Sequence, residues 1–456
     1  MTFADFILQH ENDDPVRLLL SRDKYPGIDL DLAVTTLEVR RRLKTKVPEW
    51  YAVPSLLYPS RLSGEQCSSS ETAKYKAYMI ARSIGEGVPP ETCGHPRPHK
   101  REGPAACGGR GRSAAEAVSG GIPSPIKIAD LTGGMGVDAW AFSQVAGKVL
   151  YNEVQEELAR ATELNFRELG VENVTFRNRL VEPGKVADVL GGFAPDVIFL
   201  DPARRAEDGR KVFLIEECRP DVLGLLPELF EASRFVLLKL SPMADVTMAC
   251  KRLGPHVKEV HVVAAGGECK ELLFLLDREW EGAHSTVVVE GGAVMEIPGQ
   301  AGNDEGGQAG NDEGGGAGDD VAWGMPGPGE CLFEPGKALL KAGAFGLPCG
   351  RFGLTKLGRH THLYAGEAVP EELQPFGKVF EILEVLPLSN RTLKEAGRRW
   401  PQAEVTARNV PMTSELLRKK LGCASGGDVH LFGVRVDAPA EAGNYLIVTK
   451  KRYGTD

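Results

Sequence analysis

The sequence predicts an α/β protein in which a doubly wound sheet is followed by a smaller α+β domain. Residues 126–282 alternate strand-like and helix-like runs, which is typical of a sheet covered by helices on both faces. Several of the strand-like runs are continuously apolar, as expected of parallel strands that are buried on both sides. Residues 371–456 repeat the alternation on a smaller scale, in the order βαβαββ.

The composition indicates a reduced, globular, cytoplasmic protein. At 456 residues the chain is long enough for two or three domains. No apolar run approaches the ~18 residues that a membrane helix needs, and the first residues do not have the basic and apolar pattern of a leader, so we expect no membrane association. The nine cysteines are scattered, are odd in number and form no Cys-x-x-Cys pair, which favours free thiols over a disulfide framework.

The chain divides into folded and polar segments. Residues 1–86 are predicted to form an N-terminal helical region. Residues 87–125 are rich in Pro, Gly, Arg and Ser and nearly devoid of large apolar side chains, so we expect a disordered insertion. Residues 283–330 are predicted to be a linker, because GQAGNDEG occurs twice within 299–320 and this polar repeat has no residues that could form a core.

Seven strands are predicted for residues 126–282, and two shorter units follow the linker. Residues 331–370 are too short to stand alone, and residues 371–456 form the last domain. The expected strands of the first sheet are Ile126–Ala129, Val149–Asn152, Val174–Phe176, Val197–Leu200, Phe235–Leu240, Glu259–Val263 and Glu271–Leu276. In the last domain the expected elements are Val379–Leu386, a helix at Thr392–Arg399, Val405–Ala407, a helix at Ser414–Leu421, Val429–Val436 and Tyr445–Thr449.

The first strand of the large sheet ends in an acid that is followed by a glycine-rich bend. Asp130 closes the strand, and a helix is expected to begin near Val137. Glycines let a ligand approach the backbone at the open end of a parallel sheet, where such folds bind small molecules. The bend also satisfies the loose G-x-G-x-x-A dinucleotide pattern, so a nicotinamide enzyme stays a rival interpretation. The residues of this glycine turn are Thr132, Gly133, Gly134 and Gly136.

Two further acids are predicted at the same edge of the sheet. Glu153 ends the second strand, where a carboxylate can accept hydrogen bonds from ribose hydroxyls in either type of cofactor. Asp201 and Pro202 end the fourth strand, beside the glycine turn, which a dehydrogenase does not require. Lys239, in the apolar fifth strand, could face this pocket or pair with an acid there.

In this order and spacing, the motifs DLTGGMG, YNE and LDPARR resemble the cofactor and active-site motifs of class I S-adenosylmethionine-dependent methyltransferases. Four further motifs narrow the resemblance to a bacterial group in which this domain is followed by a ferredoxin-like piece and a C-terminal THUMP-like domain. The resemblance covers most of the chain outside the two polar tracts. The four motifs are EQCSSSETAKYKA at 65–77, KLSPMAD at 239–245, ECKELL at 268–273 and GGDVHLFG at 426–433.

The resemblance implies a Rossmann-like, seven-stranded methyltransferase sheet whose last strand is antiparallel, with S-adenosylmethionine as the cofactor. Asp130 and the glycine turn would lie beneath the methionine part, and Glu153 would bind the ribose. Many relatives carry Asp after the third strand for the adenine, whereas this chain has Asn178, which becomes the adenine candidate. Segment 65–77 would cover the pocket, with Gln66, Ser68 and Tyr75 as candidate contacts.

The catalytic residues implied by the resemblance are Asp201, Pro202 and Arg204, which would face the methyl acceptor. Asp201 is also a candidate contact of the cofactor. Amine-methylating relatives carry an aromatic residue after Pro-Pro to stack on a flipped base, whereas this chain continues with Ala203 and Arg204. Carbon-methylating relatives carry a nucleophilic cysteine where this chain has Ser241. No metal site is expected, and Cys269 is interpreted as a structural thiol.

The THUMP-like resemblance implies an RNA substrate, tRNA or rRNA. Net charge is −9 overall, but residues 371–456 carry 13 Lys and Arg against 11 Asp and Glu, and phosphate contacts would come from this basic set. Two alternatives stay open: an RNA-binding module whose cofactor domain does not turn over, and an NAD(P)-dependent oxidoreductase. The basic set comprises Arg398, Arg399, Arg408, Arg418, Lys419, Lys420, Lys450, Lys451 and Arg452.

Overall fold

The computed structural model describes residues 1–84, 124–204, 214–299 and 323–452, which form two compact units. One unit comprises residues 1–258 and 273–282, and the other comprises residues 259–272 and 283–456. The expected disordered insertion and polar repeat fall almost entirely outside the described residues. None of the described helices has the length and apolarity that crossing a bilayer requires.

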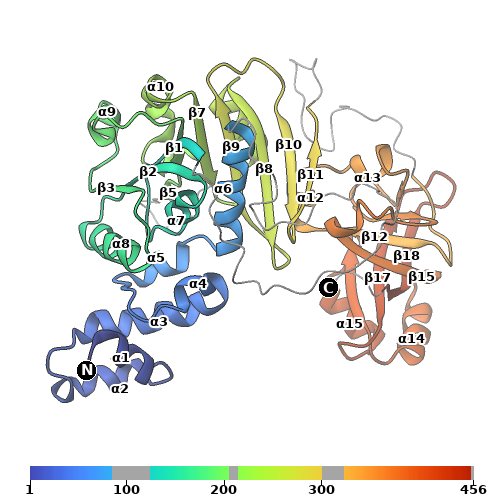
Figure 1. Ribbon diagram of the computed structural model, residues 1–456. Helices are drawn as coiled ribbons and strands as arrows, with labels where there is room; N and C mark the ends of the chain where they lie inside the picture. The colour runs from blue at the N-terminus through green and yellow to red at the C-terminus, as the bar shows by residue number, and fades with distance from the viewer. Residues whose placement is uncertain (85–123, 205–213, 300–322, 453–456) are drawn as a thin grey trace, which may run out of the picture. The chain divides into compact units, whose positions relative to one another are not determined.

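The N-terminal region is helical, as predicted. The helix α3 buries a stripe that includes Val34 and Leu37 against α1, and α6 packs along α7 of the following domain (Figure 1). Side-chain caps begin several of these helices, because Thr2, Asp14 and Asp29 each accept a hydrogen bond from a first-turn amide. The helices are α1 (Phe3–Gln9), α2 (Pro15–Leu20), α3 (Leu30–Lys46), α4 (Pro48–Tyr51), α5 (Arg61–Gln66) and α6 (Ser70–Ile84).

The central element is a nine-stranded sheet in the order β11-β10-β8-β9-β7-β4-β1-β2-β3 (Figure 1). All seven strands expected for residues 126–282 are present. The sheet strands are β1 (Ser124–Asp130), β2 (Ala146–Asn152), β3 (Val174–Arg177), β4 (Val197–Leu200), β7 (Phe235–Leu240), β8 (Val257–Ala265), β9 (Glu268–Asp277), β10 (Ser285–Glu290) and β11 (Ala293–Ile297). Its helices are α7 (Val137–Ser143), α8 (Glu156–Glu168), α9 (Val186–Leu190), α10 (Val222–Ala232) and α11 (Val246–Leu253).

The strand order reverses between β1 and β4. From β1 the chain moves outward through β2 to β3 and then returns to β4 on the other side of β1, and all of these neighbours pair in parallel. Such a reversal leaves a crevice at the carboxyl ends of the two central strands, where open α/β sheets bind ligands. Asp130 and Asp201 stand at these two strand ends.

The seven-stranded sheet that the resemblance implied is present but is extended to nine strands. The seven run in the order β3-β2-β1-β4-β7-β9-β8, and β9 is antiparallel to β8 because the two neighbours are joined by the two-residue turn Gly266-Gly267. β10 then pairs in parallel with β8, and β11 pairs antiparallel with β10. Residues 285–297, which were expected to be linker, therefore belong to the sheet.

The C-terminal unit contains a seven-stranded sheet in the order β13-β14-β12-β15-β18-β17-β16. The predicted βαβαββ order of residues 371–456 is confirmed, and the three strands of the short preceding segment join the same sheet. The strands are β12 (Cys331–Pro335), β13 (Thr355–Lys356), β14 (Tyr364–Gly366), β15 (Gly377–Pro387), β16 (Glu404–Arg408), β17 (Val429–Val436) and β18 (Gly443–Lys451). The helices are α12 (Lys337–Lys341), α13 (Leu347–Gly350), α14 (Asn390–Arg399) and α15 (Ser414–Leu421).

The two long helices of this unit meet at a glycine. Leu393 and Ala396 of α14 share a core cluster with Leu417 and Leu421 of α15. A Cβ added to Gly397 of α14 would lie 1.7 Å from the Leu421 carbonyl oxygen, which no neighbouring rotamer change could relieve. The glycine therefore sets how closely these two helices approach.

Replacing Gly397 with alanine should destabilise the protein by roughly 1–3 kcal/mol, because the added methyl group overpacks the contact between α14 and α15. In an uncrowded helix the same replacement stabilises by roughly 0.5–1 kcal/mol, so the sign distinguishes the two situations. Urea unfolding measures the difference. The matched control is Gly350→Ala, since a Cβ at this helix residue meets no atom within 4 Å. An increase in stability for Gly397→Ala would contradict the packing described here.

Candidate active site

The ends of β1 and β4 are tied together by one threonine. The Thr132 backbone amide donates to Asp130 Oδ1 at 3.1 Å, and the Asp201 amide donates to Thr132 Oγ1 at 2.7 Å. The Thr132 hydroxyl, in the turn after β1, is bonded to the backbone at the end of β4. Asp130 and Asp201 are therefore held close together. The structure thus brings together the sequence-predicted residues of both strand ends.

The glycine turn is shaped by the residues beneath it. A Cβ on Gly133 would lie 2.1 Å from the Tyr151 ring, and the Tyr151 hydroxyl donates to the Gly134 carbonyl at 2.5 Å. Gly136 has a φ of +85°, which favours glycine, and precedes the first residue of α7 as predicted. The close approach to Tyr151 and the left-handed backbone explain why this bend is glycine-rich.

Asp130 is buried in the site and is incompletely hydrogen-bonded. Its side chain is 1% exposed, and its Oδ2 atom has no hydrogen-bond partner among the described residues. Burial raises the pKa of this carboxyl well above its usual range, and repulsion from Asp138, Asp201 and Glu153 raises it further, against the Thr132 amide. A buried carboxylate oxygen of this kind is costly until a donor or cation meets it.

Glu153 and Asn178 lie together at the end of β2. Glu153 Oε2 accepts from the Gly134 amide at 2.9 Å, and its Oε1 accepts from the Gln155 amide at 2.9 Å. The Asn178 side chain follows β3 and donates to the carbonyls of Glu153 at 2.6 Å and Val154 at 3.0 Å. Glu153 therefore links the second strand to the glycine turn, and Asn178 fixes the backbone beside it.

Asp201 forms an ion pair with Lys239, one of the two possibilities that the sequence left open for this lysine. Lys239 Nζ lies 2.5 Å from Asp201 Oδ2, and the side chains are 12% and 36% exposed. Pro202, which follows, is buried, and Ala203 pairs with Arg219 in a small ladder of β5 (Ala203–Arg204) and β6 (Cys218–Arg219). The side chain of Arg204 lies outside the described residues.

A buried network beside the glycine turn was not predicted from the sequence. Lys76 of α6 is fully buried and donates to Ser68 Oγ at 3.1 Å, while Ser68 Oγ donates to Asp138 Oδ2 at 2.7 Å. Lys76 Nζ also lies 3.2 Å from Asp138 Oδ1 as an ion pair without hydrogen-bond geometry. The available signal was a lysine on the apolar stripe of α6, three residues after Ala73 and four before Ile80.

Segment 65–77 contributes Ser68 and Lys76 to this network, and its three candidate residues differ in position. Ser68 is bonded to Asp138, Tyr75 is buried at 4% exposure, and Gln66 is exposed. Cys67 is close enough for its thiol pKa, raised mainly by burial, to respond to Asp138 and Lys239. The loop before α6 therefore borders the candidate site.

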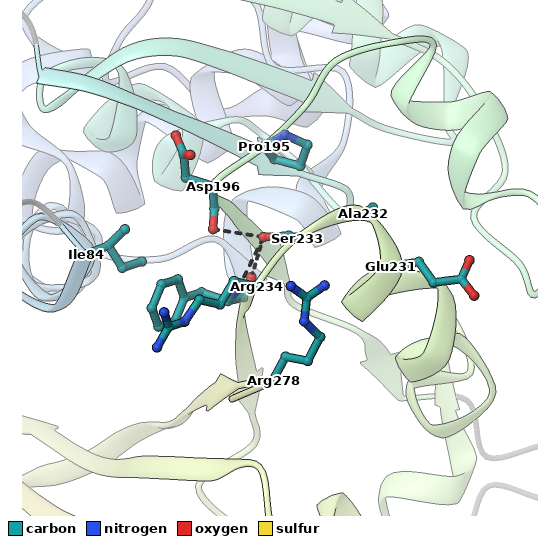
Figure 2. A pocket seen from close by; sticks show the side chains of 9 residues that line it. Ile84, Pro195, Asp196, Glu231, Ala232, Ser233, Arg234 and Arg278 are labelled. Atoms are coloured by element: carbon teal, nitrogen blue, oxygen red, sulfur yellow. Dashed lines mark hydrogen bonds between the residues drawn. The ribbon is translucent and has the colours of Figure 1, made fainter. Parts of the chain in front are cut away.

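A cavity of about 320 Å³ lies at the opposite edge of the sheet, where β4 and β7 begin (Figure 2). Ser233 Oγ donates there to the carbonyls of Asp196 at 2.8 Å and Phe235 at 3.0 Å. Its arginines are already engaged, since Arg234 makes two hydrogen bonds to Asp277 and Arg278 donates to the Phe230 carbonyl at 2.5 Å. The strand-end acids lie at the other end of these strands, so this cavity is separate from the candidate site.

Metal and thiol chemistry find little support. Within the described ranges, no group of three or more His, Cys, Asp or Glu side chains could hold a metal ion. Burial raises the pKa of Cys250 to about 12 and that of Cys269 to about 11, so neither thiol is an activated nucleophile. Ser241, at the position of the missing cysteine, accepts from the Met243 amide at 3.2 Å.

Two family models match the C-terminal part of the chain. Residues 332–373 match a ferredoxin-like domain, and residues 377–451 match the family described as THUMP domain-like. Both matches fall within the seven-stranded sheet of the second unit. The two domains that the sequence motifs indicated are therefore present.

A solved structure resembles nearly the whole chain. The crystal structure of a candidate methyltransferase from Porphyromonas gingivalis W83 is 29% identical, with a TM-score of 0.75 over 98% of this chain and 97% of that one. An RNA methyltransferase of Enterococcus faecalis V583, itself described as uncharacterized, is 33% identical over 94 residues. The match spans about a fifth of that curated relative, 21% of its length and 21% of this chain.

A third similarity covers a smaller part of the chain. An rRNA methylase candidate from Clostridium thermocellum is 12% identical and covers 34% of this chain and 90% of its own, with a TM-score of 0.26, too low to support a conclusion. The resemblance is confirmed by the nearly full-length match together with the two family models. The chain has a methyltransferase-like fold followed by ferredoxin-like and THUMP-like segments.

Replacing Asp130 with asparagine should stabilise the ligand-free protein at pH 7. The raised pKa of Asp130 means that the folded protein favours the protonated acid, so its contribution to stability falls as pH rises above the ordinary value of 3.8. Asparagine has no charge at any pH, and its oxygen can still accept from Thr132. Urea unfolding at pH 7 and near pH 4 should show a gain in stability that shrinks as the pH falls.

The matched control is Asp277→Asn in the same sheet. Although burial raises the pKa of Asp277, the Arg234 hydrogen bonds hold it below its ordinary value, so its charge stabilises the fold above that value and ceases to do so as pH falls. The asparagine variant should therefore lose stability at pH 7. If Asp130→Asn lost stability at pH 7 in the same way, the assignment of Asp130 as an uncompensated acid would be wrong.

Proposed function

We propose that this chain is an S-adenosylmethionine-dependent methyltransferase that acts on RNA, tRNA or rRNA, by direct methyl transfer at the Asp201–Arg204 segment. The observation that carries the proposal is the gathering of Asp130, Glu153 and Asp201 around the glycine turn at the strand-order reversal. Of these acids, the buried Asp130 costs stability unless a donor or cation meets its Oδ2 atom. The nearly full-length likeness to a candidate methyltransferase supports the same activity.

The residues present fit an adenosyl sulfonium cofactor. Asp130 Oδ2 is a buried acceptor in need of a donor, which suits the ammonium of a methionine moiety. Glu153, which accepts from the Gly134 amide, would bind the ribose hydroxyls, and the neighbouring Asn178 would bind the adenine. When bound, this cofactor supplies a methyl group on a positively charged sulfur.

Asp201 and Pro202 would orient the acceptor. Methyl transfer needs a nucleophile in line with the methyl carbon at ~3–3.5 Å, so positioning can supply much of the rate. Lys239 and the Thr132 hydroxyl fix Asp201 from two directions, through its carboxylate and its backbone amide. A carboxylate held in this way has a defined orientation before any acceptor arrives. Arg204 would contribute a guanidinium for a base or a phosphate.

The RNA assignment draws on the THUMP-like segment and on the E. faecalis relative, which is named an RNA methyltransferase. Exposed lysines in this domain include Lys419 and Lys420 at the end of α15, where phosphate contacts are possible. Arg399, Arg408 and Arg418 each form an ion pair with a glutamate of the same unit. We also retain the proposed division into an N-terminal helical region and methyltransferase, ferredoxin-like and THUMP-like domains, in a cytoplasmic protein.

Calorimetry and transfer assays together should establish the activity. The full chain should bind S-adenosylmethionine and S-adenosylhomocysteine but not NAD, and should transfer labelled methyl groups to RNA from a strain in which its gene is deleted. Asp201→Asn should retain binding of S-adenosylhomocysteine and lose roughly 100-fold or more in transfer, because the acceptor is no longer oriented. Tight NAD binding alone would instead identify an oxidoreductase. Cofactor binding without transfer to any RNA would identify a binding module.

The RNA affinity should depend steeply on salt. Neutralising phosphates releases counterions, so replacing both Lys419 and Lys420 with alanine should weaken binding across sequences and make the slope of log K against log salt shallower by roughly 1.5. Filter binding at several salt concentrations measures the slope. Arg391→Ala is the control, since Arg391 already pairs with Glu395 and its loss should change the slope little. An unchanged slope in the double variant would exclude these two lysines as phosphate contacts.

A further inference from the structure

Lys239 is a cation in a strand that is otherwise apolar and buried. The side chains of Leu238 and Leu240 on either side are 0% and 5% exposed, and that of Lys239 itself is 12% exposed. Placing an ammonium there has a desolvation cost, which the pairing with Asp201 opposes. A leucine would complete the strand without that cost, so packing alone does not account for the lysine.

The amine of Lys239 lies within the candidate site. Its partner Asp201 is bonded through its amide to Thr132 of the glycine turn. The Asp201–Lys239 pair therefore lies at the same end of the sheet as Asp130. It lies beside the segment proposed to receive the methyl acceptor.

The surroundings disfavour two acceptor types, exocyclic amines and base carbons. A base presented through its exocyclic amine is normally held by an aromatic face, whereas the residue after Pro202 is Ala203, whose backbone pairs with Arg219. Methylation at a base carbon needs a thiolate, and Ser241 stands at that position with its oxygen bonded to the Met243 amide. A hydroxyl acceptor needs neither feature. It needs a base that removes a proton.

We propose that the acceptor is a ribose 2′-hydroxyl of RNA and that Lys239 is the catalytic base that takes its proton. The inference rests on the proposed methyltransferase function. The hydroxyl oxygen forms a bond to the methyl carbon, the carbon–sulfur bond breaks with its electrons staying on sulfur, and the hydroxyl proton moves to the neutral Lys239 amine. The resulting ammonium is stabilised by Asp201, as an acid stabilises the cation formed on a neighbouring base in other enzymes.

The proposal requires the neutral form of the Lys239 amine. Low exposure disfavours the ammonium, and so does a second positive charge, such as a sulfonium, in the same pocket. Asp201 acts in the opposite direction and keeps the amine in place. Lys239 therefore combines a fixed position with a proton that can be exchanged, whereas arginine at this position would keep its charge at all working pH values.

The chemical form of the product tests the acceptor. RNA from a strain in which the gene is deleted is methylated by the full chain with tritiated S-adenosylmethionine and then hydrolysed with alkali. A methylated 2′-oxygen cannot attack the neighbouring phosphate, so the label should appear in alkali-stable dinucleotides. Label in mononucleotides would overturn the inference and leave the methyltransferase function standing. Absence of label from RNA would count against the proposed function itself.

Two variants test the base. Lys239→Arg keeps a cation beside Asp201 but cannot give up its proton, so transfer should fall roughly 100-fold or more while calorimetric binding of S-adenosylhomocysteine changes less than about twofold. Lys239→Met should show the same pattern without the charge. The wild-type rate should rise with pH as the lysine loses its proton, and this limb should be absent in both variants. Arginine activity within about threefold of wild type, with the pH limb intact, would overturn the role.

Discussion

The hydroxyl and backbone of Thr132 hold the candidate site together. Its amide bonds to the acid that ends β1, and its hydroxyl receives the amide of the acid that ends β4. β1 and β4 pair in parallel as far as Asp130 and Phe199, and the Thr132 hydroxyl adds a bond at the point where the two chains leave the sheet. The positions of Asp130 and Asp201 relative to the glycine turn both depend on this bridge. A small change there would separate the cofactor side of the site from the acceptor side.

The three strand-end acids are compensated in different ways, and the differences suggest their roles. Glu153 accepts two backbone amides, and Asp201 faces Lys239, so both carboxylates are satisfied in the ligand-free protein. Asp130 receives one amide, keeps a buried oxygen without a donor among the described residues, and is repelled by its neighbours. Of the three strand-end acids, Asp130 is therefore the one whose charge the contacts of the described residues leave uncompensated. A cationic ligand at that position would recover the cost as binding energy, which explains how a marginally unfavourable acid can persist in a stable sheet.

The sequence predicted the strands better than the interactions between them. Val197–Leu200 and Phe235–Leu240 coincide with β4 and β7, because a continuous apolar run bounded by Pro-Asp, Asp-Pro or Ser-Pro has few other interpretations. The hairpin of β10 and β11 was assigned to a linker because its short strands adjoin a polar repeat that dominates the local composition. The contact of Ser68 with Asp138 joins residues 70 apart, and no local pattern encodes such a pairing. The acids of the site were found because strand topology alone brings strand ends together.

Charge counting overstated the basic character of the C-terminal domain. Arg399, Arg408 and Arg418 contribute to the positive sum of residues 371–456, yet each is paired with a glutamate and offers less to a phosphate. Two of those partners, Glu384 and Glu404, lie in the same segment, whereas Glu334 precedes it. Lys419 and Lys420 instead extend from the end of α15, where the helix dipole already favours cations. If RNA binds this domain, its affinity will therefore depend on a few exposed lysines and not on the net charge. The proposed cofactor site lies on β1, β2, β4 and β7 of the other unit, so we expect that the two properties can be altered separately.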